Sequence, residues 1–147
     1  ENIANTIAEK LGVEAINVTD FSAYTIANHD NLILGTSTWG AGELQDDWYD
    51  GVNVLKDADL SGKTVAIFGF GDSESYSDTF CAAMKEIYDA AEGANIIGSI
   101  STDGYTFDDS DAVVDGKFIG LPLDDVNEDD KTEGRIDAWL DSIKGSL

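Results

Sequence analysis

The sequence is poor in several residue types on which whole classes of protein depend. Its single cysteine, Cys81, excludes an internal disulfide and fits a reducing compartment. Cys81 lies in an apolar helical stretch, where we expect a small, buried side chain. The sequence contains no run of about 18 or more apolar residues and no basic-then-apolar leader, so it predicts neither a membrane span nor a secretory signal. We therefore expect a cytoplasmic protein.

Basic residues are scarce as well. Eight Lys+Arg stand against 30 Asp+Glu, which gives a formal net charge of −22 at pH 7. Such a chain repels nucleic acid phosphates and anionic lipids, so neither is an expected partner. The charge has two interpretations: a solubilising or salt-adapted surface, or an acidic face that steers the protein onto basic partners. Composition alone leaves both open.

Signatures of common catalytic and metal sites are missing too. No G-x-S-x-G elbow or Cys–His pairing indicates nucleophilic catalysis, and the only histidine, His29, is interpreted as a surface residue. G-F-G-D at 69–72 lacks the third glycine of a dinucleotide-binding fingerprint. Aspartates gather near the C-terminal end without the spacing and glycine of a calcium loop, so we expect a solvated acidic turn. These are Asp124, Asp125, Asp129 and Asp130.

The sequence does contain a regular alternation of helices and strands. Apolar residues at helical spacing predict helices at 1–11, 45–55, 77–92 and from Thr132 onward. Ser77 is the predicted N-cap of the helix at 77–92. Apolar or alternating runs predict strands at 13–18, 31–35, 63–69, 95–101 and 117–121. Polar segments at 19–30 and 102–116 separate some of these elements. The pattern predicts one α/β domain of 147 residues, in which helices cover both faces of a parallel sheet.

Two glycine-containing loops follow strands of this predicted sheet: T-S-T-W-G-A-G-E-L-Q at 36–45 and G-F-G-D-S-E-S-Y at 69–76. Ligands bind at the carboxyl edge of such sheets. Trp39 on one loop and Tyr76 on the other could clamp a flat heteroaromatic ring. The ring's polar edge would then be bonded by loop amides, those of Gly40, Gly42, Gly71 and Asp72. The alternative is that both rings are ordinary surface aromatics.

Four motifs, taken in order, resemble the long-chain flavodoxins: T-S-T-W-G-x-G-E-L-Q-x-D-W, A-I-F-G-x-G-D-x-x-x-Y-x-D-x-F, S-T-D-G-Y-x-F-x-x-S-x-A-V-x-x-G-K-F-x-G-L-x-L-D and R-I-x-x-W. The resemblance covers essentially all 147 residues. The interruption at 102–116, which splits the last strand, marks the long-chain type. Flavodoxins are a standard example of the doubly wound fold, with strand order 2-1-3-4-5 and FMN at the switch point. The resemblance therefore implies a five-stranded parallel sheet.

The resemblance also implies FMN as cofactor, with Trp39 and Tyr76 stacking on its isoalloxazine ring. Gly40 lies at the peptide that turns over in the family when the flavin is reduced, and glycine makes this turn inexpensive. Two matched positions depart from the family's usual residues: Ser37 replaces proline, and Phe70 replaces a small polar residue. The remaining cofactor contacts that the resemblance implies involve Ser37, Thr38, Ala41, Gly42, Phe70, Gly71, Asp72, Thr79, Phe80 and Cys81.

The function implied by the resemblance is that of a low-potential one-electron carrier, a monomer and not an enzyme. Its partners would be basic-faced redox proteins, such as flavodoxin reductases and low-potential oxidoreductases. The family binds the FMN phosphate with a T/S-x-T/S-G-x-T loop between its first strand and first helix. Because this sequence begins inside that helix, we expect the strand and the phosphate loop in residues before Glu1. The alternative is a flavin-free acidic docking or regulatory module, similar to receiver domains, although Asp72 has no neighbouring lysine.

Overall fold

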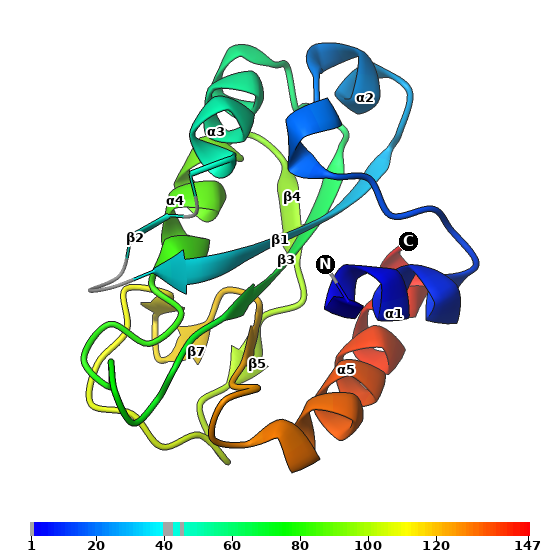
Figure 1. The fold of residues 1–147 in the computed structure, drawn as a ribbon. Coiled ribbons are helices and arrows are strands. Elements are labelled where there is room, and N and C mark those ends of the chain that lie inside the picture. Colours follow the sequence, from blue (N-terminus) through cyan, green and yellow to red (C-terminus); the bar gives the residue numbers. More distant parts are fainter. Residues whose placement is uncertain (1, 40–42, 45) are drawn as a thin grey trace.

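The computed structural model describes residues 2–39, 43–44 and 46–147, which are organised around one central sheet (Figure 1). Four strands of this sheet run parallel, and β3 lies between β1 on one side and β4 with β8 on the other. Their bounds are Asn31–Trp39 (β1), Thr64–Phe70 (β3), Asn95–Ile97 (β4) and Leu121–Leu123 (β8). A short strand, β2 (Glu43–Leu44), pairs antiparallel with the end of β1. The expected parallel sheet is confirmed.

The last strand of the sheet is split in two. β4 pairs with the first three residues of β3, and β8 pairs with the last three. Because β1 occupies the whole opposite edge of β3, β4 and β8 must fill one strand position together. The segment between them forms a small antiparallel sheet of β5 (Ile100–Ser101), β7 (Lys117–Phe118) and β6 (Val113–Val114). The interruption that splits the last strand, expected from the sequence, is confirmed.

Helices cover both faces of the sheet (Figure 1). Along β3, Val65 and Ile67 point into a core shared with α3 and α4, whereas Ala66 and Phe68 point into a core shared with α1 and α5. The four helices span Asn2–Leu11 (α1), Trp48–Asp57 (α3), Ala83–Ala90 (α4) and Asp129–Ile143 (α5). In the part of the chain that the structure describes, no helix is long and apolar enough to cross a membrane. The near-continuous apolar run of β3 is thus explained by burial on both faces.

The strand predicted at 13–18 is wrong. Val13 is 61% exposed and Ile16 is 51% exposed, and the amide of Val13 donates to the carbonyl of Ala8 in α1. The alternation of apolar residues produces a strand only beside a partner strand, and here it leads into a short 3-10 helix, η1 (Val18–Asp20). The polar connector that follows contains one more short helix, α2 (Ala23–Ala27). The C-terminus ends in another, η2 (Lys144–Ser146).

Several predicted bounds also move. The strand predicted at 95–101 is divided between β4 and β5, and the one predicted at 117–121 is divided between β7 and β8. The helices predicted from 45 and from Thr132 begin at Trp48 and Asp129.

The helix expected from Ser77 begins at Ala83 instead, because Ser77 forms hydrogen bonds with residues of the insertion. Its hydroxyl donates to the Asp108 carboxylate (2.8 Å), and its carbonyl accepts the amides of Asp108 and Asp109. The loop expected from residue 36 is still strand up to Trp39, because β1 pairs there with β3 and then with β2.

Candidate functional site

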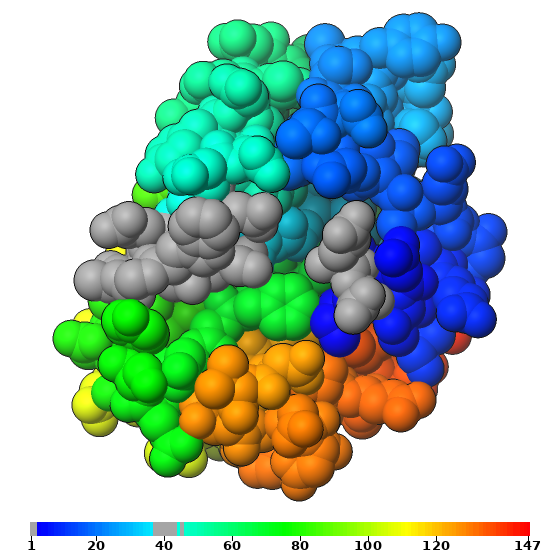
Figure 2. All heavy atoms as spheres, in the orientation of Figure 1, coloured from blue at the N-terminus to red at the C-terminus, as the bar shows by residue number. Residues whose placement is uncertain are grey.

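Three chain segments leave the same edge of the sheet at the same level. Ser37 of β1 pairs with Phe70 of β3, and Phe70 pairs with Leu123 of β8. The end of β1, the loop at 71–76 and the turn at 124–128 therefore lie at the carboxyl ends of neighbouring parallel strands. Figure 2 shows the second and third of these segments, green and orange, in contact on one face of the molecule. The first residues of the two predicted loops, 36–37 and 69–70, lie side by side as predicted, whereas 40–42 and 45 lie outside the described residues; the third segment was missed.

The end of β1 is described by its backbone. Ser37, Thr38 and Trp39 form the end of β1, where the structure describes their backbone alone. Gly40, Ala41 and Gly42 lie outside the described residues. The ring contact assigned to Trp39 therefore stays a prediction, as do the backbone contacts assigned to its neighbours.

The Gly71 amide has a hydrogen-bond partner within the fold. It donates to the Leu123 carbonyl (3.0 Å), which extends the β3–β8 pairing by one hydrogen bond, so this amide is already used. Glycine is needed there for close approach, since a Cβ atom would lie 2.7 Å from the Cys81 nitrogen and 2.9 Å from Phe80 Cδ1. Tyr76, at the end of the loop, is 44% exposed, so its ring is accessible at the surface.

Asp72 determines the shape of this loop. Its Oδ1 accepts the amides of Ser75 (2.9 Å) and Glu74 (3.2 Å) and the side-chain nitrogen Nδ2 of Asn127 (2.7 Å). These bonds, the Ser75 amide first and then Asn127, lower the pKa of the Asp72 carboxyl. An ionised Asp72 thus anchors the loop to the turn that follows β8, and its carboxylate is not a free recognition group.

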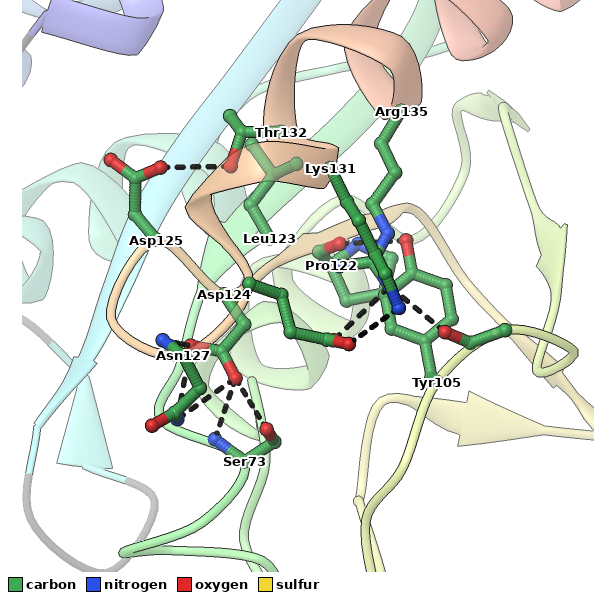
Figure 3. A network of polar contacts seen from close by, with 12 residues as sticks. Ser73, Tyr105, Pro122, Leu123, Asp124, Asp125, Asn127, Lys131, Thr132 and Arg135 are labelled. Atoms are coloured by element: carbon green, nitrogen blue, oxygen red, sulfur yellow. Dashed lines mark hydrogen bonds and ion pairs between the residues drawn. The ribbon is translucent and has the colours of Figure 1, made fainter.

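Asp124 is a functional candidate that sequence reasoning missed. It was expected in a solvated turn, but it is 0% exposed, whereas Asp125, Asp129 and Asp130 are exposed as expected. Its carboxylate accepts the hydroxyl and the amide of Ser73, the amides of Val126 and Asn127, and Asn127 Nδ2 (Figure 3). Burial alone raises the pKa of Asp124, but the bonds from Ser73 and Asn127 outweigh it and leave the pKa lowered. The available signal was its position directly after a buried strand.

The segment after the loop is largely core. Phe80 is 1% exposed and packs against Tyr105, Phe107 and Phe118 of the insertion, with ring centroids 5.7 to 6.2 Å apart. Cys81 is fully buried, as expected from its apolar stretch, and burial raises the pKa of its thiol. These two side chains belong to the core, and the cofactor contacts implied for Phe80 and Cys81 stay predictions.

Two further candidates fit a ligand site better. Thr79 Oγ1 is buried and has no hydrogen-bond partner among the described residues, while the Thr79 amide donates to the Tyr76 carbonyl (3.2 Å). Thr79 therefore holds an unsatisfied polar atom close to the exposed Tyr76. Phe70, at the end of β3, is half-buried and meets Phe68 edge to face, with centroids 6.3 Å apart.

Comparison with known proteins decides the family. The model of the flavodoxin family matches residues 1–139 of the chain. The chain belongs to the flavodoxin family. Members of this family are electron-transfer proteins and not enzymes.

Individual flavodoxins resemble the chain over most of its length. It is 44% identical to flavodoxin 1 of Azotobacter vinelandii over 147 aligned residues, which cover 94% of this chain and 84% of the relative. It is 40% identical to the flavodoxin of Helicobacter pylori, over all of this chain and 90% of that protein. The crystal structure of Fusobacterium nucleatum flavodoxin bound to flavin mononucleotide superposes with a TM-score of 0.90 at 31% identity, covering 99% of this chain and 88% of that one. A mutant of that flavodoxin, also bound to flavin mononucleotide, superposes at 0.93.

Proposed function

We propose that this flavodoxin is a low-potential one-electron carrier that uses non-covalently bound FMN and shuttles electrons between redox enzymes. One observation carries the proposal: the fold superposes on FMN-bound flavodoxin with a TM-score of 0.93 at 32% identity, over 99% of the chain. The three segments at the carboxyl edge of the sheet are in the place where doubly wound folds bind ligands.

The residues at this edge fit such a cofactor. Tyr76 presents an exposed ring, and Trp39 ends β1, the strand that neighbours β3, so we propose that a flat ring lies between the two. Thr79 Oγ1 is buried without a hydrogen-bond partner among the described residues, so it would gain a bond from a polar group of the cofactor that reaches it. The proposed contacts with the flavin are made by the backbone of Thr38, Gly40, Ala41, Gly42 and Asp72, whereas the Gly71 amide donates to the Leu123 carbonyl within the fold.

When bound, FMN supplies the electron chemistry, which belongs to the cofactor. The chain binds the ring, shields it from water and holds negative charge beside it. The Asn127 side chain donates hydrogen bonds to both Asp72 and Asp124. Asp72 follows the end of β3, and Asp124 follows the end of β8. Negative charge at the site disfavours the addition of an electron, so these residues support a low potential.

The net charge of the chain also favours particular redox partners. A net charge of −22 favours fast encounters with redox partners that present basic faces, such as flavodoxin reductases and low-potential oxidoreductases, and it opposes self-association. We propose that the protein works as a monomer. The cytoplasm is the proposed compartment, in keeping with a single, buried and unpaired cysteine.

Flavin binding tests the proposal. The full chain should be yellow or become so on reconstitution with FMN, and the variants Trp39→Ala and Tyr76→Ala should each bind FMN about tenfold more weakly, since each loses a stacked ring. Tyr24→Ala is the matched control, because Tyr24 is 79% exposed on α2 and should leave the affinity unchanged. Titration of flavin fluorescence measures all four proteins. A colourless wild-type protein that cannot be reconstituted would instead favour the flavin-free docking module.

A further inference from the structure

One residue of the insertion between β4 and β8 is bonded to the chain directly after Tyr76. The hydroxyl of Ser77 donates to the Asp108 carboxylate (2.8 Å), and the Asp108 amide donates to the Ser77 carbonyl (2.7 Å). The Asp109 amide donates to the same carbonyl (2.9 Å). The pairing of Ser77 with Asp108 is therefore reciprocal, side chain to side chain and backbone to backbone, across 31 positions of the sequence. Both the place and the rotation of Ser77 are set by the insertion.

The ring of Tyr76 is placed mainly by the backbone that carries it. Tyr76 is 44% exposed, and none of the aromatic ring pairs formed within the described part of the chain includes it. Its amide donates to the Asp72 carbonyl (2.9 Å), and its carbonyl accepts the Thr79 amide (3.2 Å). Because the backbone conformation of a residue limits the directions open to its side chain, the ring direction depends on the chain on both sides of Tyr76. On the C-terminal side, that chain is Ser77.

A ring that stacks on a ligand binds it more tightly when the ring is already in position. If the chain around the ring is loose, binding must also order that chain, and the free energy of ordering is lost from the affinity. The loop at 71–76 is anchored at its start by the pairing of β3 with β8. At its end, the hydrogen bonds between Ser77 and the insertion are the corresponding anchor.

We propose that Asp108 is a positioning residue for the cofactor site, whose hydrogen bonds to Ser77 hold the adjacent Tyr76 ring in the place where it stacks on FMN. The inference rests on the proposed function, in which Tyr76 is one of the two stacking rings. Asp108 acts through Ser77 and not through a contact of its own with FMN. The insertion thereby takes part in cofactor binding.

Removing the acceptor tests the inference. Asp108→Ala should bind FMN about three- to tenfold more weakly, which is the effect of one hydrogen bond. Loss of the negative charge alone would favour an anionic cofactor, so it predicts the opposite direction. Asp108→Asn makes the same charge change but keeps a side-chain oxygen for the Ser77 hydroxyl, and its affinity should stay within about twofold of wild type. Asp111→Ala, at an exposed position of the same insertion, is the matched control and should bind FMN like the wild-type protein. Titration of flavin fluorescence measures all of these affinities.

Double variants identify the route by which Asp108 acts. Once Tyr76→Ala has removed the ring, adding Asp108→Ala should weaken FMN binding by less than about twofold, because no stacking ring is left to position. Ser77→Ala removes the same side-chain hydrogen bond from its other end, so it should weaken binding as much as Asp108→Ala does. The two changes together should weaken binding no more than either one alone. Ser77→Ala also serves if thermal melts of the flavin-free protein show that Asp108→Ala does not fold.

The outcomes are distinguishable. Wild-type affinity in both Asp108→Ala and Ser77→Ala would overturn the inference while leaving the proposed function intact, provided that the wild-type protein binds FMN. Equal weakening in Asp108→Asn and Asp108→Ala would also overturn it, because the hydrogen bond would then have no part in the effect. So would an undiminished effect of Asp108→Ala in the Tyr76→Ala protein, since Asp108 would then act by a route other than the ring. Failure of the wild-type protein to bind FMN would instead overturn the proposed function, and the inference with it.

Discussion

At the scale of single residues, the candidate site depends on carboxylates that accept hydrogen bonds within the fold. Asp72 and Asp124 both have a lowered pKa, and in each case the hydrogen bonds that lower it include some from the loop at 71–76 and from Asn127. A carboxyl group whose pKa is lower in the folded protein adds stability above its unfolded pKa, about 3.9 for aspartate. That stability is lost as the pH falls through the folded pKa. The two groups therefore make the free energy of unfolding decrease at acid pH.

This linkage predicts how an Asp72→Asn variant responds to acid. Asparagine keeps a side-chain oxygen for the Ser75 amide, so the loop should keep its shape, while the titrating group is gone. The free energy of unfolding of the wild-type protein should fall as the pH is lowered from about 5 to 3, and that of Asp72→Asn should fall less steeply. Urea unfolding at a series of pH values measures both slopes. Asp103→Asn, an exposed position in the insertion, should keep the wild-type slope, and equal slopes in all three proteins would contradict the prediction.

At the scale of elements, one arginine fastens the insertion to the last helix. Arg135 of α5 donates through Nη2 to the Gly104 carbonyl (2.9 Å) and to Glu128 Oε1 (3.1 Å). Its guanidinium lies over the ring of Tyr105, 4.0 Å from the centroid, and the Tyr105 hydroxyl donates to the Pro122 carbonyl (2.8 Å) (Figure 3). The insertion, α5 and β8 therefore meet at the side chain of Tyr105. This junction lies next to the turn that holds Asp124.

Replacement of this arginine by lysine should loosen the insertion. A lysine keeps the charge but lacks the planar fork that bonds a carbonyl and a carboxylate while stacking on a ring. In Arg135→Lys, amides at 100–118 should exchange with solvent about tenfold faster, whereas those of β3 should be unchanged. Hydrogen exchange followed by mass spectrometry measures the effect. Lys144→Ala, at the other end of α5, is the control, and unchanged protection at 100–118 in Arg135→Lys would show that the aromatic cluster holds the insertion alone.

The elements also show what could be predicted from the sequence and what could not. β1, β3 and α5 were predictable because their apolar residues repeat at a spacing that burial imposes, as with Ile136, Trp139 and Leu140 on one side of α5. The strand at 13–18 failed because local alternation carries no information about a partner strand. The helix start at Ser77 failed because Ser77 bonds Asp108, 31 residues away. The burial of Asp124 depends likewise on Ser73, 51 residues away, which no local pattern reveals.

At the scale of the whole molecule, repulsion between the excess carboxylates lowers the free energy of unfolding. Lys10 of α1 shows what the few basic residues do, since its Nζ lies 2.8 Å from Asp137 and 3.7 Å from Glu133 of α5 and so joins two helices on one face of the sheet. Eight Lys+Arg cannot pair 30 Asp+Glu, so most carboxylates of the chain repel one another. This repulsion favours partners of opposite charge and disfavours the compact state.

Screening should therefore stabilise the protein. Raising NaCl from about 0.01 to 0.2 M shortens the Debye length from about 30 Å to below 10 Å and weakens repulsion between surface carboxylates more than it weakens the close ion pairs. We expect the melting temperature of the flavin-free protein to rise by several degrees over this range, because about 1 kcal/mol corresponds to roughly 2–4 °C for a domain of this size. A variant that carries Glu9→Gln, Glu92→Gln, Asp103→Asn and Asp111→Asn removes four exposed carboxylates and changes the net charge from −22 to −18. Its melting temperature should start higher and rise less with salt. Thermal melts by circular dichroism measure both proteins. If salt lowered the melting temperature of the wild-type protein, its ion pairs would outweigh the repulsion, and the acidic surface would impose no cost on folding.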